Sequence, residues 1–209
     1  MGIENFISFV LTALIFIMTP GIDTVFVLNK SMGQGKASGA YAAFGVNAGV
    51  LIHTLFAALG LSVIVANSAT AFTTVKFAGA AYLMYLGVMK LKNNKNMFTT
   101  GIVDKGKTNA KANCISGFLT NAMNPKVALF FLAFFPQFIN PEQMKNPVPF
   151  LVLGLSYALI GTLWFLILSF FAGMFSEKIK GNEKAGPWLN RFSGVVFILM
   201  GLKIAFSNN

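Results

Sequence analysis

Charged side chains are scarce in this sequence. Only 11% of the 209 residues are Asp, Glu, Lys or Arg, while 56% are hydrophobic. Soluble domains carry roughly 25% charged residues, and a soluble domain with so few charges would leave much apolar surface in contact with water. A disordered chain would need far more polar residues. The composition therefore excludes both classes and predicts an integral membrane protein.

Residues that carry chemistry are also few. The chain has one cysteine, Cys114, and one histidine, His53. A single cysteine excludes an internal disulfide, a dithiol redox pair and a cysteine-rich metal cage. The sequence contains no HExxH, GxSxG or Walker motif and no cluster of metal ligands. We therefore expect neither an enzyme nor a cofactor or metal site, and without a nucleotide site any transport would be driven by a gradient.

Long apolar runs are abundant, and six of them are long enough to cross a bilayer as helices, which takes about 20 residues. The first begins within MGIENF, which lacks the positive charge of a cleavable signal peptide, so we expect it to remain as a span. The runs lack the alternation of membrane β-strands. The sequence predicts an all-α protein with one transmembrane domain over 1–209 and spans at about 6–28, two within 36–92 divided near 67–70, 114–138, 148–175 and 188–206.

The basic residues are distributed unevenly between these spans. Of the 16 Lys and Arg residues, two lie between spans one and two, six between three and four, and four between five and six. Because positive loops stay in the cytoplasm, we expect these three gaps there and both termini outside. The basic loop at about 92–112 has a single aromatic residue, Phe98, with which to stack a base, so no nucleic-acid partner is expected.

An internal repeat relates the two halves of the chain. Lys76-Phe77-Ala78-Gly79 recurs as Arg191-Phe192-Ser193-Gly194, and Met18-Thr19-Pro20 recurs as Met123-Asn124-Pro125, at offsets of 115 and 105 residues. The matches predict two three-span halves, about 1–92 and 113–209. Since three is odd, the halves must be inverted relative to each other. Inverted repeats are a recurrent plan of secondary transporters, whose substrate site lies near the midplane.

Each half has a proline near the middle of its first span. Thr19 precedes Pro20 and Asn124 precedes Pro125, and Thr or Asn suits an N-cap while Pro suits the first helical position. We expect both helices to stop and restart here, with Gly21 loosening the backbone further. A restarted helix directs the positive end of its dipole at the mid-membrane, where it would favour a carboxylate. The alternative is a plain kink without function.

Asp23 and Lys126 are the charged residues that lie deep inside the predicted spans. A charge at this depth costs about 2.5–3.5 kcal/mol on insertion scales, so it needs a partner, a cavity or a proton. We expect Asp23 to bind a substrate ammonium or to carry a coupling proton, unless it is hydrated near the cytoplasmic end. Lys126 would serve as partner of a carboxylate or as counter-ion of Asp23. Straight helices would separate the two by on the order of 10 Å in depth, so a direct ion pair is not predicted.

Uncharged polar residues in the spans are weaker candidates. His53 titrates near neutral pH when free and is a candidate for proton coupling, although a lone histidine in a helix is more often a packed, hydrogen-bonded residue. Asn47 and Asn121 are polar contacts between helices by default and candidates for lining a pocket. Gly45 and Gly49, four residues apart, predict close packing of two helices.

Four segments together resemble the LysE/RhtB family of bacterial amino-acid exporters: Thr19–Asp23, Lys76–Leu83 with Leu86-Gly87, Asn121–Lys126 and Phe134–Phe138. The resemblance implies a six-helix exporter of small amino acids or their derivatives, driven by the proton-motive force, in a bacterial cytoplasmic (inner) membrane. The family's first motif commonly reads Pro-Gly-Pro-Asp or Pro-Gly-Pro-Asn. Ile22 replaces the second proline here, so the break would be milder.

Two other functions stay open at this point. A metal-ion exporter of the wider superfamily would need several ligands at one depth, where the spans offer Asp23, His53 and Cys114. A non-transporting membrane scaffold would need no charge at the midplane, and Asp23 and Lys126 argue against it. The partners expected are an amino-acid-like substrate, a coupling proton and the lipid bilayer, and the spans are compatible with a homodimer.

Overall fold

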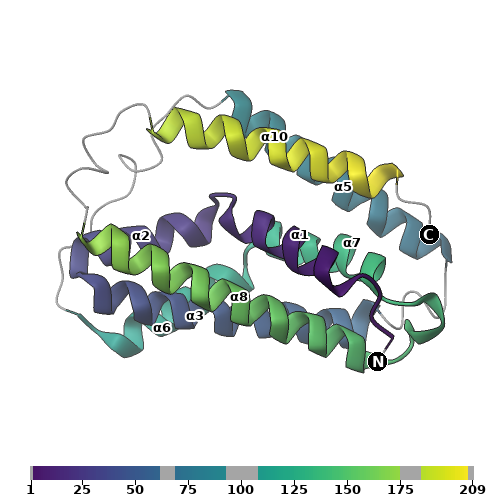
Figure 1. The fold of residues 1–209 in the computed structure, drawn as a ribbon, viewed down its shortest axis with the longest axis horizontal. Coiled ribbons are helices and arrows are strands. Elements are labelled where there is room, and N and C mark those ends of the chain that lie inside the picture. The colour runs from purple at the N-terminus through teal and green to yellow at the C-terminus, as the bar shows by residue number, and fades with distance from the viewer. Residues whose placement is uncertain (1, 62–68, 93–107, 175–184, 207–209) are drawn as a thin grey trace.

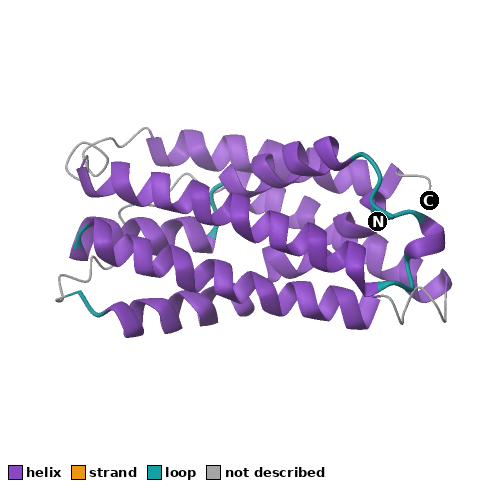
Figure 2. Cartoon of the chain, turned by 60° about the horizontal axis from the view of Figure 1, so that its bottom comes forward, coloured by secondary structure: helices purple, strands orange, loops and turns teal. Residues whose placement is uncertain are grey.

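The computed structural model describes residues 2–61, 69–92, 108–174 and 185–206, which form a bundle of helices (Figures 1 and 2). Within these ranges no strand is formed, and Ile3 and Ile139 make one isolated bridge. The α-helices are α1 (Phe6–Met18), α2 (Ile22–Gln34), α3 (Lys36–Phe56), α5 (Ala69–Lys92), α6 (Ala110–Ala122), α7 (Pro125–Phe134), α8 (Pro147–Met174) and α10 (Ala185–Phe206). Short turns extend or join them: π-helical η1 (Ala57–Leu61) and 3₁₀ turns η2 (Phe135–Phe138) and η3 (Pro141–Gln143).

The predicted all-helical class is confirmed. Each predicted apolar segment corresponds to one helix or to a bent pair, although α2 continues to Gln34, past the predicted end at residue 28. The predicted division near 67–70 lies partly outside the described residues, and α5 begins at Ala69. The basic loop predicted at about 92–112 also lies mostly outside them.

The described helices include three that are long and apolar enough to cross a membrane, at Lys36–Gly60, Pro147–Ala172 and Pro187–Phe206. The number rises to five if each of two bent pairs is one span. Helix α5 is not among these candidates, although its 24 residues would extend on the order of 36 Å at 1.5 Å per residue. The count of six spans and the inverted repeat therefore stay predictions.

Both bends occur at the predicted prolines. Helices α6 and α7 meet at 51°, with Asn124 and Pro125 in the predicted cap and first-residue positions. The Asn124 Oδ1 atom accepts a hydrogen bond of 3.0 Å from the Lys126 backbone N–H. Helices α1 and α2 meet at 57°. The helix interruption expected in each half is thus present.

The capping role expected for Thr19 is wrong. Its hydroxyl donates to the Ile15 carbonyl oxygen at 2.7 Å, within the helix that precedes it, so Thr19 ends α1. Pro20 lies between the helices, and Gly21 takes the position before α2. The Gly21 N–H points to the Thr24 hydroxyl oxygen at 3.5 Å. This hydrogen bond directs the Thr19 side chain back along α1, away from the N–H groups that begin α2.

Glycines bring the central helices close together. Helix α3 packs against α6 and α8, and α5 packs lengthwise against α10 along one edge of the bundle (Figure 1). A Cβ atom added at Gly45 or Gly49 would overlap the backbone of α6, at Cys114 and Phe118 respectively. The close packing predicted for these glycines is confirmed.

Aromatic rings fill the space between α1 and α7, and apolar side chains cover the outside. The rings of Phe16 and Phe130 lie 4.4 Å apart, and those of Phe9 and Phe135 lie 5.5 Å apart. Outward-facing residues such as Ile7 and Leu159 are 77% and 62% exposed. An apolar exterior around a packed interior is the arrangement expected in lipid.

Candidate functional site

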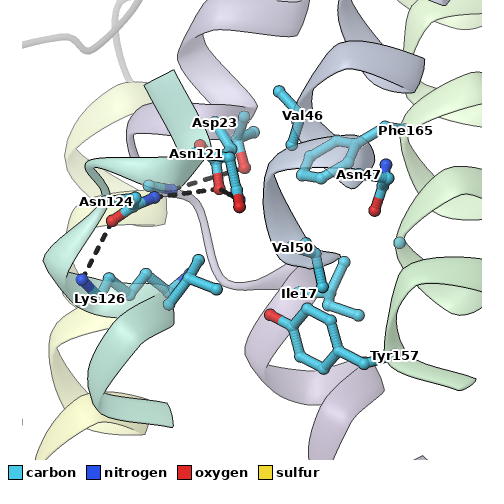
Figure 3. Close-up of a pocket in the computed structure, with 14 residues that line it drawn as sticks. Ile17, Asp23, Val46, Asn47, Val50, Asn121, Asn124, Lys126, Tyr157 and Phe165 are labelled. Atoms are coloured by element: carbon cyan, nitrogen blue, oxygen red, sulfur yellow. Dashed lines mark hydrogen bonds between the residues drawn. The ribbon is translucent and has the colours of Figure 1, made fainter. Parts of the chain in front are cut away.

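The two helix breaks lie beside each other and line one cavity together with α3 and α8 (Figure 3). The space in which the centre of a water molecule fits measures ≈ 20 Å³, so the cavity has room for about one water. Of the predicted site residues, Gly21, Asp23, Asn47, Asn121, Asn124 and Lys126 line it. The remaining lining residues are Ile17, Thr24, Val46, Val50, Val127, Tyr157, Gly161 and Phe165.

Two predicted residues lie beside this cavity instead. Pro125 lines a neighbouring cavity of ≈ 110 Å³, which shares Gly21, Asn124 and Lys126 with the first. Pro20 is buried in the break between α1 and α2. The prolines therefore shape the backbone around the cavity.

Asp23 is buried, with 7% of its surface exposed, and two asparagines hold it. Its Oδ2 atom accepts hydrogen bonds from Asn121 Nδ2 at 2.8 Å and from Asn124 Nδ2 at 3.0 Å. Asp23 also stands in the first turn of α2, where the helix dipole favours a negative charge. Its other oxygen, Oδ1, and Asn121 Oδ1 are both buried without a hydrogen-bond partner among the described residues.

The ammonium of Lys126 is directed to α1. Its Nζ atom donates to the carbonyl oxygens of Thr19 at 2.7 Å and Phe16 at 3.0 Å. It also lies over the rings of Phe16 and Phe197, 4.5 and 5.2 Å from their centroids. A cation at the C-terminal end of a helix compensates the negative end of the dipole, and the ring faces attract it further. Lys126 and Asp23 thus line one cavity while their hydrogen bonds go to different partners.

These contacts cross between the two breaks. Asp23, from the α1–α2 break, is bound by the residues at the α6–α7 break, and Lys126, from the α6–α7 break, binds the end of α1. Each break is therefore stabilised by a charged side chain from the other half of the chain.

His53 and Asn47 make hydrogen bonds within the bundle. His53 Nε2 lies 2.9 Å from the carbonyl oxygen of Asn121, and because a carbonyl only accepts, this nitrogen carries the hydrogen. His53 is buried outside the cavity lining, and this is the packed arrangement usual for a lone histidine. Asn47 Nδ2 donates to the Ala43 carbonyl at 2.8 Å. The part of His53 in proton coupling stays a prediction.

Sequence reasoning missed the contribution of α8. Tyr157 is 4% exposed, and its hydroxyl is directed from α8 into the cavity (Figure 3). Phe165 lies two turns further along the same helix, and Gly161 between them leaves space for the Asn47 amide oxygen. The available signal was the phenol hydroxyl itself, since the predicted fifth span contains no charged residue before its end.

Among the residues that the structure describes, no three His, Cys, Asp or Glu side chains lie close enough to hold a metal ion. The cavity instead offers one carboxylate, one ammonium, three side-chain amides and a wall of aliphatic and aromatic groups. Such a mixture binds small organic molecules by charge, hydrogen bonds and apolar contact.

Comparison with known proteins places the chain among membrane translocators. The sequence matches the LysE type translocator family over residues 14–208. It is 31% identical to an uncharacterized membrane protein, YrhP, of Bacillus subtilis, over 98% of this chain and 100% of the relative. It is 30% identical to a leucine efflux protein of Salmonella choleraesuis and 28% identical to one of an Enterobacter species, each over 98% of this chain and 96% of the relative. No solved structure matches it.

The family match extends over nearly the whole chain and includes every helix that lines the cavity. The apolar helices fit the membrane location that the relatives' names state. The chain therefore belongs to the LysE type translocator family, and it is a membrane transporter rather than an enzyme.

Proposed function

We propose that the protein exports small apolar amino acids, with leucine the first candidate, from the cytoplasm in exchange for protons. The observation that carries this proposal is the pair of buried acceptor oxygens, Asp23 Oδ1 and Asn121 Oδ1, which have no partner among the described residues and belong to a cavity between two broken helices. A buried acceptor without a donor costs about 1–3 kcal/mol. An arriving ammonium group or proton would remove that cost.

The ammonium of the substrate or the coupling proton would bind at Asp23. Both supply the donor that Asp23 Oδ1 lacks, and one carboxylate holds only one of them as its charge partner. Alternate occupancy of Asp23 by substrate and proton is a simple basis for exchange, because each must leave before the other binds.

The substrate carboxylate would lie at the restarted helices, near Gly21 and Pro125. The positive end of α7 is directed at this region, and Lys126 contributes its amino group to the cavity wall. Because the Lys126 ammonium donates to two carbonyl oxygens of α1, it would assist by its field or exchange one of these hydrogen bonds for the substrate.

Leucine is the first candidate because apolar groups form much of the cavity wall. Aliphatic and aromatic surface lines the cavity that Asp23 enters, and it comes from Ile17, Val46, Val50 and Phe165. A branched aliphatic side chain would bury its own surface against these groups. The relatives from Salmonella choleraesuis and the Enterobacter species are named leucine efflux proteins. A cavity with room for about one water must widen before it holds leucine, so substrate binding requires the surrounding helices to move apart.

The proposed membrane arrangement follows from the charges. We place the protein in a bacterial cytoplasmic membrane with six spans, the bent pairs and α5 each counting as one. Spans one to three and four to six form inverted halves, and both termini face outside. The distribution of Lys and Arg supports this orientation.

The test is efflux of radiolabelled leucine from proteoliposomes, with and without a pH gradient. The parent protein is expected to release leucine faster with the gradient, and Asp23→Asn, which keeps the shape of the side chain, is expected to lose gradient-driven efflux. Glu142→Gln is the matched control, because it also removes one negative charge but lies exposed between α7 and α8.

Absence of gradient-driven efflux for leucine and for the other amino acids would contradict the export proposal and favour a scaffold or another cargo. Full activity of correctly inserted Asp23→Asn would contradict the site assignment alone.

A further inference from the structure

Three cavities adjoin one another along the α1–α2 break. The cavity at Asp23 shares Gly21, Asn124 and Lys126 with the cavity of ≈ 110 Å³, and this one shares Gly21, Ile22 and Lys90 with a wider cavity of ≈ 380 Å³. The widest cavity reaches Phe26 and Asn29 on α2, toward the C-terminal end of that helix. The basic gap between the first two predicted spans lies at this end. The shared residues make one lined path from Asp23 toward that end of the bundle.

Lys90 lines both the cavity of ≈ 110 Å³ and the cavity of ≈ 380 Å³, as Gly21 and Ile22 also do. It stands in the last turn of α5, is half-buried, and its Nζ atom lies 3.4 Å from Asn190 Oδ1 on α10. A buried lysine side chain at a membrane helix end commonly extends outward to water, whereas Lys90 borders the seam between α5 and α2. Lys90 is thus placed where it can contact a molecule that enters the path.

The path has a strongly uneven charge. Lys90 and Lys126 come from different helices and line the same cavity of ≈ 110 Å³, and no Asp or Glu is among the described residues that line this cavity or the wider one. Two cations in a confined space of low polarity attract an anion far more strongly than they would in water. A substrate carboxylate would bring a negative group to this lining, as far as the structure describes it.

We propose that Lys90 binds the carboxylate of the amino acid in an access site at the cytoplasmic side, before the substrate reaches Asp23. This inference rests on the proposed export of amino acids and names a residue that the sequence did not single out. The order of charges along the path then sorts the cargo: a carboxylate is needed first, at Lys90, and an ammonium second, at Asp23. Simple amines fail the first step.

The first experiment measures leucine efflux by proteoliposomes carrying Lys90→Gln, Lys90→Arg or Lys92→Gln. Lys92 is the matched control, because it lies in the same last turn of α5 and its charge interacts with the helix dipole in the same way. It is exposed and lines none of the three cavities. We expect Lys90→Gln to raise the KM for leucine about tenfold with little change in maximal rate, the loss typical of one hydrogen bond to a charged group. Lys90→Arg should restore the KM, and Lys92→Gln should leave it unchanged.

The second experiment tests occupancy without requiring turnover. Val25→Cys, which lines the wider cavity and keeps Lys90, is made in a Cys114→Ser background and treated with a cationic methanethiosulfonate reagent in the presence of leucine or of 3-methylbutylamine, which is leucine without its carboxylate. We expect leucine at saturating concentration to slow labelling several-fold relative to the amine, because Lys90 and Lys126 attract the carboxylate, and Lys90→Gln in the same background should remove the difference.

The outcomes distinguish the two proposals. A parent protein that exports no amino acid contradicts the proposed function, while the labelling experiment still decides the access site. An unchanged KM in Lys90→Gln, or equal protection by leucine and by the amine, overturns the access site even if the parent exports leucine normally.

Discussion

Two asparagine amides hold the Asp23 carboxylate, and neither neutralises its charge. Asn121 and Asn124 each donate one hydrogen bond to Oδ2, while Oδ1 has no donor among the described residues. A carboxylate with one saturated and one unsaturated oxygen is fixed in place yet still able to bind. Amide donors are suited to this role because, unlike a lysine or arginine, they do not compete with a substrate ammonium for the charge.

Tyr157 provides a test of the cavity at the level of a single atom. Tyr157→Phe removes one hydroxyl but keeps the ring, which packs 5.1 Å from Phe130 and 5.3 Å from Phe131. We expect the KM for leucine to rise about three- to tenfold, the effect of one lost neutral hydrogen bond, with an unchanged melting temperature. Initial rates of efflux over a range of internal leucine concentrations measure this.

Tyr85→Phe is the control for Tyr157→Phe, because Tyr85 is 56% exposed on α5 and lines none of the three cavities. A KM that stays at the parent value in Tyr157→Phe would remove the phenol from the binding site and leave it a packing residue.

The sequence predicted which charged side chains lie at the cavity but not which groups they contact. Asp23 and Lys126 were conspicuous because charges are rare in apolar spans. Their partners depend on how the two bent helix pairs approach each other, and the sequence does not give the 51° and 57° bends that decide this. Tyr157 was missed because one hydroxyl in a long apolar run carries no charge to mark it.

The seam between α3 and α6 shows how elements of this bundle are held together. Gly45 and Gly49 on α3 and Gly117 on α6 allow the two backbones to come closer than side chains would permit. Without a hydrophobic driving force between helices in lipid, such close contact is a main source of their association. The seam also supports the cavity, since Asn121 on α6 packs beside Gly49 and lines this cavity, while Asn47 enters it from the other face of α3, beside Gly161 of α8.

Gly45→Ala tests this seam. The added methyl group would overlap the carbonyl oxygen of Cys114, and we expect destabilisation of about 1–3 kcal/mol, as is typical of overpacked interiors. Thermal unfolding in detergent should show a lower melting temperature. Gly60→Ala is the control, because a Cβ atom at Gly60 would have no described atom within 4 Å, and equal melting temperatures for the two variants would contradict the close packing.

Helix ends show where element-level prediction works. Asn124 and Pro125 cap and start α7 as predicted because the amide oxygen reaches the N–H two residues ahead. Thr19 was predicted by the same rule and ends the preceding helix instead, because its hydroxyl binds the Ile15 carbonyl. Sequence patterns locate a break well, but which side of it a threonine serves depends on the backbone that surrounds it.

For the whole molecule, charge asymmetry is the main guide to orientation. The net charge is +10, and most of the positive residues fall in three gaps that alternate along the chain with gaps holding few. The all-helical class and the family followed from composition and motifs, whereas the number of spans did not follow from the described helices alone. Hydropathy is calculated for each segment alone, whereas α5 packs against α10. Whether α5 crosses the membrane therefore depends on that packing as well as on its own composition.

The orientation is tested by introducing single cysteines into a Cys114→Ser background. Glu142→Cys, between α7 and α8, should react with a membrane-impermeant maleimide in intact cells. Ala37→Cys, exposed in the first turn of α3, should react only after the membrane is permeabilised. The opposite pattern would reverse the orientation, and labelling of both in intact cells would contradict the assignment of these two segments to opposite sides.

The crossed contacts between the breaks impose a mechanical condition on the transport cycle. Two hydrogen bonds tie Asp23 to the α6–α7 break and two tie Lys126 to the end of α1, so straightening either bent pair by itself would strain these four buried contacts. The two bent pairs are therefore coupled, and moving both together costs less free energy than moving one alone. A movement of one bent pair alone would break the most contacts, so we expect the two breaks to rearrange as one unit.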